Sequence, residues 1–234
     1  DRRPMASPPS RGGRAALLPE ELALVLLDAE ARETARLPLG GRNIREGLAW
    51  LAEHGPGGRG DLALPAHELP AHAVGGGAVF AASGRRAERA ELARWYANTD
   101  RLLRGLGRQA KHASPARLWP HHFDLATLVR LDPTEKGEDA RSIGVGMTPG
   151  DDSYPEPYWY VTPWPYPAAE RLGALDGDGR WHTEGWTGAV LRASALADGA
   201  SAQDQAGQVI AFVHSALNAS WAALEPRREE KRDG

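Results

Sequence analysis

The sequence predicts an α+β fold in which an antiparallel sheet of four or more strands, in the C-terminal half, packs against N-terminal helices and a C-terminal helix. Apolar residues recur at helical spacing over much of the first half, and their spacing changes to a period of two after Leu118. The segments with a period of two are separated by turns such as "TPGDD" and "LDGDG", which are typical of antiparallel connections.

Three helices are predicted before the sheet, over Leu18–Arg36, Asn43–His54 and Arg85–Leu106. Pro19 suits the first turn of the first helix, because proline lacks the N–H that this turn leaves unpaired. Asn43 is the expected N-cap of the second helix, with Glu46 as its capping-box partner. The third helix is predicted from its long apolar stripe.

Four strands and a last helix follow in the second half. The strands are expected over His122–Leu131, Ser142–Met147, Pro157–Trp164 and Trp186–Ala193. Repeated prolines indicate that the third strand ends at a sheet edge or in a polyproline stretch. Ser201 is the expected N-cap of the last helix, with Asp204 in its capping box. The apolar face of this helix is expected to consist of Ile210, Val213, Leu217, Trp221 and Leu224.

The length of 234 residues suits one domain. We expect it to cover residues 14–225, helical to about residue 112 and sheet-rich over 118–225. A disordered leader of residues 1–13 and a solvated tail of residues 226–234 are expected to flank it.

Composition excludes several classes of function. The net charge of −3 gives no footprint for nucleic acid, and the absence of cysteine excludes thiolate nucleophiles and Cys-ligated metals. The glycine run at 75–77 lacks the Lys-Ser/Thr of a phosphate loop, so no nucleotide cofactor is predicted. No apolar run is long enough for a membrane span. We therefore predict a cytoplasmic protein without nucleic-acid or membrane partners; a small-molecule ligand and a homodimer are the partners considered.

Three blocks of the second half resemble a family of uncharacterised bacterial proteins known only as a domain of unknown function. They contain "WPHHFDLA", "EPYWY" and "WHTEGWTGAVL", and the resemblance covers about residues 90–224. The wider family pattern is similar to W-x-x-F-D-L-A, so His121 and His122 are features of a subgroup. The resemblance implies no activity.

The stretch "WPHHFD" contains the first candidate site. In a strand, His122 and Asp124 would share one face, about 7 Å apart, and could hold one divalent cation. The predicted metal ligands are His121, His122, Asp124 and His182. The metal would be zinc, manganese or iron, and Glu156 or Glu184 would be the base in metal-assisted hydrolysis. The alternatives are acid–base use without a metal and a purely structural strand entrance.

Aromatic residues concentrate in the same half of the chain. Five of the eight tryptophans lie between Trp119 and Trp186, more than a sheet of this size needs in its core. Rings that line a concave surface suit a small organic ligand or a sugar. The predicted ligand-binding rings are Trp119, Tyr158, Tyr160, Trp181 and Trp186. The rival hypothesis is a non-catalytic interaction or structural protein that docks a partner on the aromatic, proline-rich edge "YWYVTPWPYP".

Overall fold

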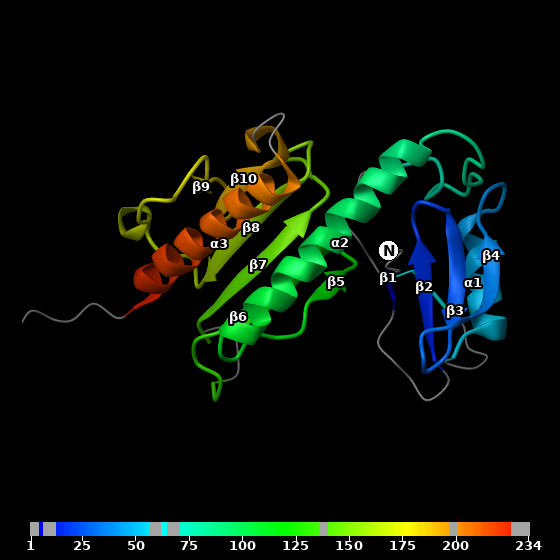
Figure 1. Cartoon of the computed structure of the whole chain (residues 1–234), viewed down its shortest axis with the longest axis horizontal. Coiled ribbons are helices and arrows are strands. Elements are labelled where there is room, and N and C mark those ends of the chain that lie inside the picture. The colour runs from blue at the N-terminus through cyan, green and yellow to red at the C-terminus, as the bar shows by residue number, and fades with distance from the viewer. Residues whose placement is uncertain are drawn as a thin grey trace, which may run out of the picture. The chain divides into compact units, whose positions relative to one another are not determined.

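The structure is a computed structural model that describes residues 5–6, 13–56, 62–64, 71–135, 140–196 and 201–225. It confirms the α+β class (Figure 1). Its contacts divide the chain into two compact units, Asp1–Asn98 and Thr99–Gly234, whose boundary falls inside a long helix. The single domain over 14–225 stays a prediction. None of the described helices is both long and apolar enough to cross a membrane.

The first unit contains an antiparallel sheet in the order β1-β2-β3-β4. The strands are β1 (Met5–Ala6), β2 (Arg14–Leu18), β3 (Ala23–Leu27) and β4 (Glu33–Pro38). Helix α1 (Ile44–His54) follows, with the predicted capping box between Asn43 and Glu46. In α1, Gly47 is buried and faces Leu24 and Leu39.

The predicted helix over Leu18–Arg36 is wrong, because this segment contains the last residue of β2, the whole of β3 and most of β4, joined by two tight turns. Leu22 ends the first turn with a left-handed φ of 49°, which breaks the helical path. In the second turn, the Asp28 carboxylate accepts the backbone N–H groups of Glu30 and Arg32. The apolar run from Leu22 to Leu27 satisfies either period, and sheet pairing decides between them.

The terminal predictions have different outcomes. Met5 and Ala6, expected in the disordered leader, pair with Leu17 and Ala16 as β1. Residues 1–4 and 7–12 of the leader, and the whole predicted tail 226–234, lie outside the described residues. The N-terminal part is therefore less helical than predicted, because it contains a sheet of its own.

The second unit contains a six-stranded antiparallel sheet in the order β5-β6-β7-β8-β10-β9. The strands are β5 (Arg117–Trp119), β6 (Asp124–Arg130), β7 (Ser142–Thr148), β8 (Tyr158–Trp164), β9 (Arg180–His182) and β10 (Gly188–Arg192). The helices are α2 (Arg86–Gln109), which begins in the first unit, the 3-10 turns η1 (Ala169–Arg171) and η2 (Ala193–Ala195), and α3 (Ala202–Leu224). All four predicted strands are confirmed within a few residues, whereas the short β5 and β9 were not predicted.

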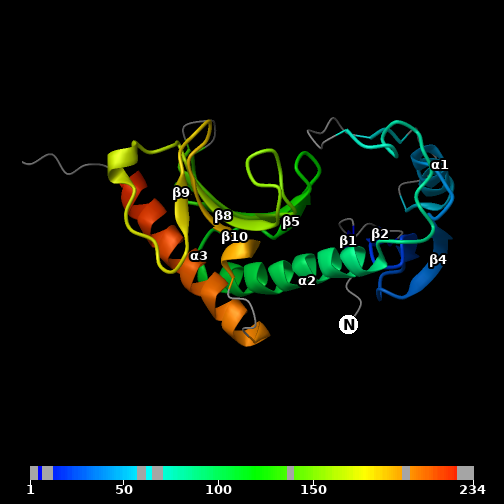
Figure 2. The same cartoon turned by 90° about the horizontal axis from the view of Figure 1, so that it is seen from above.

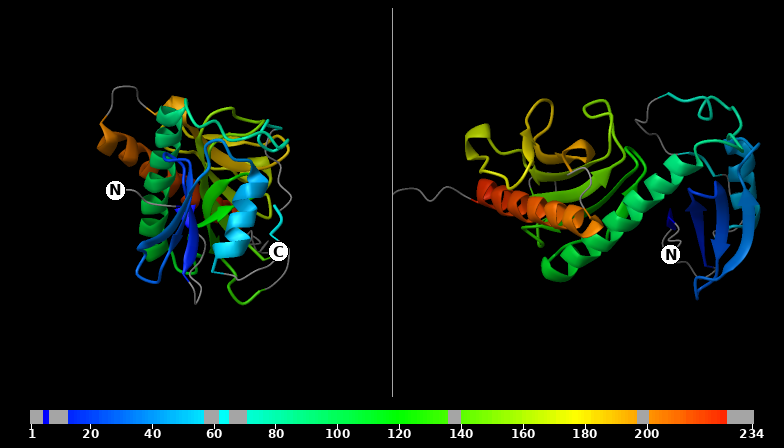
Figure 3. Two further views of the ribbon diagram at one scale, coloured as in Figure 1. Left: turned by 90° about the vertical axis from the view of Figure 1, so that its right-hand side faces the viewer. Right: turned by 45° about the horizontal axis from the view of Figure 1, so that its top comes forward.

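Helix α3 and the C-terminal part of α2 lie against one face of this sheet (Figures 2 and 3). Trp159 of β8 points to this face, since it shares a small apolar cavity with Leu102 of α2 and Val209 of α3. Successive strand residues alternate between faces, and Val161 therefore shares the face of Trp159. Val161 and Phe212 are almost completely buried in this layer.

The capping box of α3 at Ser201 and Asp204 is confirmed, but the predicted apolar face is partly wrong. Val213 and Leu224 are buried as expected, whereas Ile210 and Trp221 are 42% and 48% exposed. The buried residues of the helix are instead Val209, Phe212, Val213, Ala216, Ser220, Ala223 and Leu224. Small residues on this face let the helix approach the sheet closely, so size and not only polarity sets its orientation.

Strand β8 is not an edge of the sheet, since it lies between β7 and β10. Its pairing with β7 extends from Tyr158 to Trp164, but the pairing with β10 ends at Val161. Pro163 therefore follows the point where the register with β10 stops, which is compatible with its missing N–H. The proline-rich end has the local character of an edge, although the strand as a whole is internal.

Candidate functional site

The candidate site lies on the distal face, which we define as the face of the six-stranded sheet turned away from α3. Strand alternation and register place Asp124, Gly146, Tyr158, Tyr160 and His182 on this face. Most of the polar residues predicted from the sequence belong to this face or to the loops beside it.

The centre of the distal face is a hydrogen bond in which the Tyr160 hydroxyl donates to the Asp124 carboxylate. Tyr160 belongs to β8 and Asp124 to β6, so the tyrosine side chain crosses the intervening strand β7. It crosses at Gly146, where an added Cβ would lie 2.7 Å from the Tyr160 Oη. Of the two glycines in the β7 stretch "SIGVG", Gly146 therefore has a structural reason, since it provides the space for this ring.

Burial shapes the chemistry of this pair. Burial raises the pKa of Asp124, while the Tyr160 hydrogen bond and the charges of His122 and His121 act in the opposite direction. Burial and the neighbouring Asp124 carboxylate raise the pKa of Tyr160 well above its usual value. The tyrosine hydroxyl thus stays protonated and acts as a donor. The Asp124 carboxyl group binds its proton more tightly than an exposed aspartate does.

The two histidines do not lie in the strand. β6 begins at Asp124, and His121 and His122 lie exposed in the turn that connects β5 to β6. Phe123, between the turn and the strand, has a left-handed φ of 59°. The predicted alternation of His122 and Asp124 along one strand is therefore wrong, although both histidines are close enough to influence the pKa of Asp124.

Trp119 lies beside Asp124 on the distal face. It is the cross-strand partner of Asp124 in the β5–β6 hairpin, and cross-strand partners point to the same face. Its side chain is 46% exposed. An exposed indole therefore lies beside a partly buried carboxyl group, with two histidines in the adjoining turn.

A second group of contacts attaches the loop between β7 and β8 to the sheet. Asp151 accepts the backbone N–H groups of Ser153 and Tyr154 with one oxygen and the Tyr158 hydroxyl with the other, at 2.5 Å. Burial and this carboxylate raise the pKa of Tyr158. The rings of Tyr154 and Tyr158 contact edge to face, with centroids 5.1 Å apart. Tyr154 was not among the predicted site residues.

His182 joins this second group. Its Nε2 lies 2.7 Å from the Glu184 carbonyl oxygen, and its Nδ1 lies 3.0 Å from the Tyr154 hydroxyl. Because a carbonyl only accepts, Nε2 carries the proton, and in the neutral ring Nδ1 accepts from Tyr154. The His182 ring also stacks on Trp186, with centroids 4.4 Å apart. Both nitrogens of His182 are therefore engaged within the protein.

The remaining predicted residues have other surroundings. The Glu156 carboxylate accepts the N–H and the hydroxyl of Ser194, at 2.7 and 2.8 Å, so its contacts support a structural role. Glu184 is exposed and contacts His182 through its backbone. Trp181 pairs with Ala189 on the α3 side of the sheet, so it does not share the distal face with the other predicted rings.

Among the described residues, no group of three or more His, Asp or Glu side chains is close enough together to hold a metal ion. The metal site and the catalytic roles of Glu156 and Glu184 stay predictions. Compared with known proteins, the chain matches no family model, no curated protein and no solved structure. The resemblance to a domain of unknown function also stays a prediction. A function is therefore inferred from the geometry of the chain alone.

Proposed function

We propose that the distal face binds a small ligand with several hydroxyl groups and a flat apolar side, such as a sugar. The observation that carries this proposal is the position of exposed Trp119 directly across the hairpin from Asp124. An indole ring stacks on the apolar side of such a ligand, and a carboxylate accepts its hydroxyl protons.

The Asp124–Tyr160 pair prepares the site for this ligand. The Tyr160 hydroxyl donates to one carboxylate oxygen of Asp124 and fixes the direction of the group. The backbone N–H of Asp124 donates to the carboxylate as well, and an ionised carboxylate has about four lone-pair sites, so it can still accept a hydroxyl proton of the ligand. A group held in place before binding loses little conformational freedom when the ligand arrives. The exposed His121 and His122 lie beside this position and supply further polar contacts.

The proposal is tested by titrating a panel of monosaccharides and small polyols into the labelled protein and following amide chemical shifts. We expect binding to weaken about tenfold or more in both Trp119→Ala and Asp124→Asn, a loss of roughly 1.4 kcal/mol or more. Trp164→Ala is the matched control, because Trp164 is a tryptophan of similar exposure, 41%, and lies at the C-terminal end of β8, away from the hairpin that contains Trp119. Unchanged affinity in Trp119→Ala would contradict the proposal.

The rival function, a docking surface for a partner, has one specific observation in its favour. Trp164 and Tyr166 are 41% and 45% exposed, and their rings contact edge to face with centroids 5.1 Å apart. Exposed paired aromatics are typical of surfaces that bind proline-rich peptides. The same two variants distinguish the functions: peptide binding that is lost in Trp164→Ala and kept in Trp119→Ala would favour the rival.

A further inference from the structure

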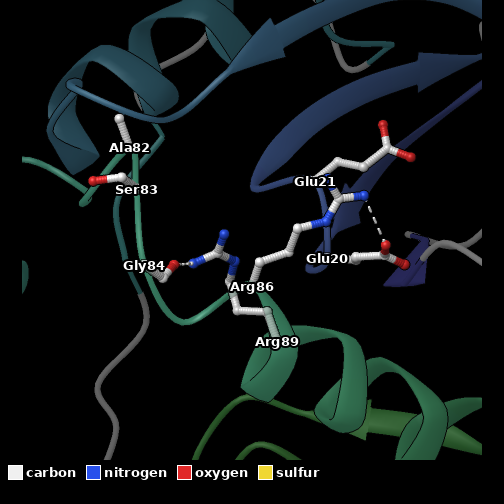
Figure 4. Close-up of a pocket in the computed structure, with 7 residues that line it drawn as sticks. All are labelled: Glu20, Glu21, Ala82, Ser83, Gly84, Arg86 and Arg89. Atoms are coloured by element: carbon white, nitrogen blue, oxygen red, sulfur yellow. Dashed lines mark hydrogen bonds and ion pairs between the residues drawn. The ribbon is translucent and has the colours of Figure 1, made fainter.

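The first unit contains a second candidate site, independent of the distal face. It is a cavity of about 530 Å³ between the turn that joins β2 to β3 and the beginning of α2 (Figure 4). Glu20 and Glu21 line it from the turn, whereas Ser83, Arg86 and Arg89 line it from the loop before α2 and from the helix itself. Two acidic residues thus line the cavity from one element and two arginines from another.

The acidic residues have partners within the protein. Glu20 pairs with Arg86, with Oε1 3.0 Å from Nη2. Glu21 pairs with Arg36, with Oε2 2.6 Å from Nη1. These pairs hold the acidic residues at the cavity, but exposed or half-exposed pairs of this kind add little stability by themselves.

Arg89 differs from the other charged residues of the cavity. Its Nη1 donates to the Gly84 carbonyl oxygen at 2.9 Å, and none of the described carboxylates forms an ion pair with it. Its Nε is buried and has no hydrogen-bond partner among the described residues. A buried donor without an acceptor is unfavourable, so an acceptor that rearranges this guanidinium would gain binding energy.

The arrangement of charges restricts the class of ligand. A simple anion would be attracted by Arg89 and repelled by Glu20 and Glu21, and a simple cation would meet the opposite problem. We propose that this cavity binds a zwitterion of the size of an amino acid or a dipeptide. Its carboxylate pairs with Arg89, where a planar fork of donors suits a carboxylate, and its ammonium group lies at Glu20. The volume is within the range of small-molecule sites.

The experiment uses glycylglycine as the probe, titrated into the labelled chain of 234 residues and followed by amide chemical shifts. We expect saturable binding that weakens about tenfold or more in Arg89→Gln and in Glu20→Gln. Arg94→Gln is the matched control, because Arg94 lies on the same helix and pairs with Glu91 outside the cavity. Its binding should equal that of the wild type.

Blocked peptides test the carboxylate and the ammonium group of the probe one at a time. N-acetylglycylglycine retains only the carboxylate and glycylglycinamide only the ammonium group, and each should bind about tenfold more weakly than the probe. No saturation up to about 50 mM probe, which lies beyond the roughly millimolar range of weak ligands, would overturn the proposal. Equal binding of N-acetylglycylglycine would also overturn it, in favour of a simple anion site. If Arg89→Gln does not fold, Glu20→Gln and the blocked peptides still test whether the cavity binds a zwitterion.

Discussion

Replacement of Gly146 by alanine tests the central contact of the distal face. A Cβ at this position would lie 2.7 Å from the Ala126 Cβ and 2.7 Å from the Tyr160 Oη. Carbon atoms in contact are usually separated by about 3.5 Å or more, so the alanine must displace its neighbours by roughly 0.8 Å. Tyr160 cannot move away without weakening its hydrogen bond to Asp124.

The expected loss in free energy of unfolding follows from these two effects, the steric overlap and the weakened hydrogen bond. Overpacking in a close-packed layer costs about 1–3 kcal/mol, and a weakened hydrogen bond between a buried hydroxyl and a carboxylate adds roughly another 1 kcal/mol. We therefore expect Gly146→Ala to lower the free energy of unfolding by about 2–4 kcal/mol. In a thermal scan this corresponds to a decrease in Tm of roughly 5–15 °C, at about 2–4 °C per kcal/mol for a chain of this size.

Gly144→Ala is the matched control, because Gly144 lies two residues away on the same strand and the same face. There, an added Cβ would meet only the Thr162 carbonyl oxygen, at 3.9 Å, which is an ordinary contact. We expect Gly144→Ala to change stability by no more than about 1 kcal/mol, in the stabilising direction, since alanine loses less freedom than glycine on folding. Urea unfolding followed by tryptophan fluorescence measures both variants. Equal destabilisation by the two substitutions would refute the close approach of Tyr160 to Gly146.

Three further predictions concern the second unit. Burial raises the pKa of Asp124 above 3.8, so the wild type should lose stability relative to Asp124→Asn as the pH rises from about 4 through that raised pKa. Urea unfolding at several pH values measures the difference in free energy of unfolding between the two proteins, and a difference that does not change with pH would contradict the prediction. Tyr160→Phe removes the donor to Asp124 and should cost about 1–3 kcal/mol in urea unfolding, whereas Tyr166→Phe, at an exposed ring, should cost under roughly 0.5 kcal/mol. Ser201→Ala removes the N-cap of α3 and should lower stability by about 0.5–2 kcal/mol, and hydrogen exchange at the first turn should increase; unchanged protection would contradict the capping box.

The local signals of the sequence were sufficient for much of the fold. Capping boxes at Asn43 and Ser201 involve residues three apart, so they can be recognised without knowledge of the tertiary structure. The change of period after Leu118 likewise located β6, β7, β8 and β10. The apolar run from Leu22 to Leu27 was ambiguous, because it fits a helix and a strand equally. Pairing with β2 and β4 makes it a strand, and pairing is not a local property.

The candidate site was predictable only in part. Asp124 and Tyr160 could each be identified as residues able to bind a ligand, but their hydrogen bond joins positions 36 residues apart in the chain. The order of β6, β7 and β8 brings these two residues together, and Gly146 allows the ring to cross between them. The period of two predicts a strand that begins at His122, whereas the structure places both histidines of "HHFD" in the hairpin turn before β6.

The sequence by itself thus determined the α+β class, two helix caps, four strands and the residue types of the distal face. Only the tertiary structure decided which side of the sheet each ring occupies and which carboxylates have partners. The physical reason is that caps and periodicity depend on interactions between neighbours in the chain, whereas strand order and register depend on the packing of whole layers. Trp119 and Asp124 lie side by side on the distal face because a hairpin pairs them, and Trp181 is separated from the other rings because its register directs it to the α3 side.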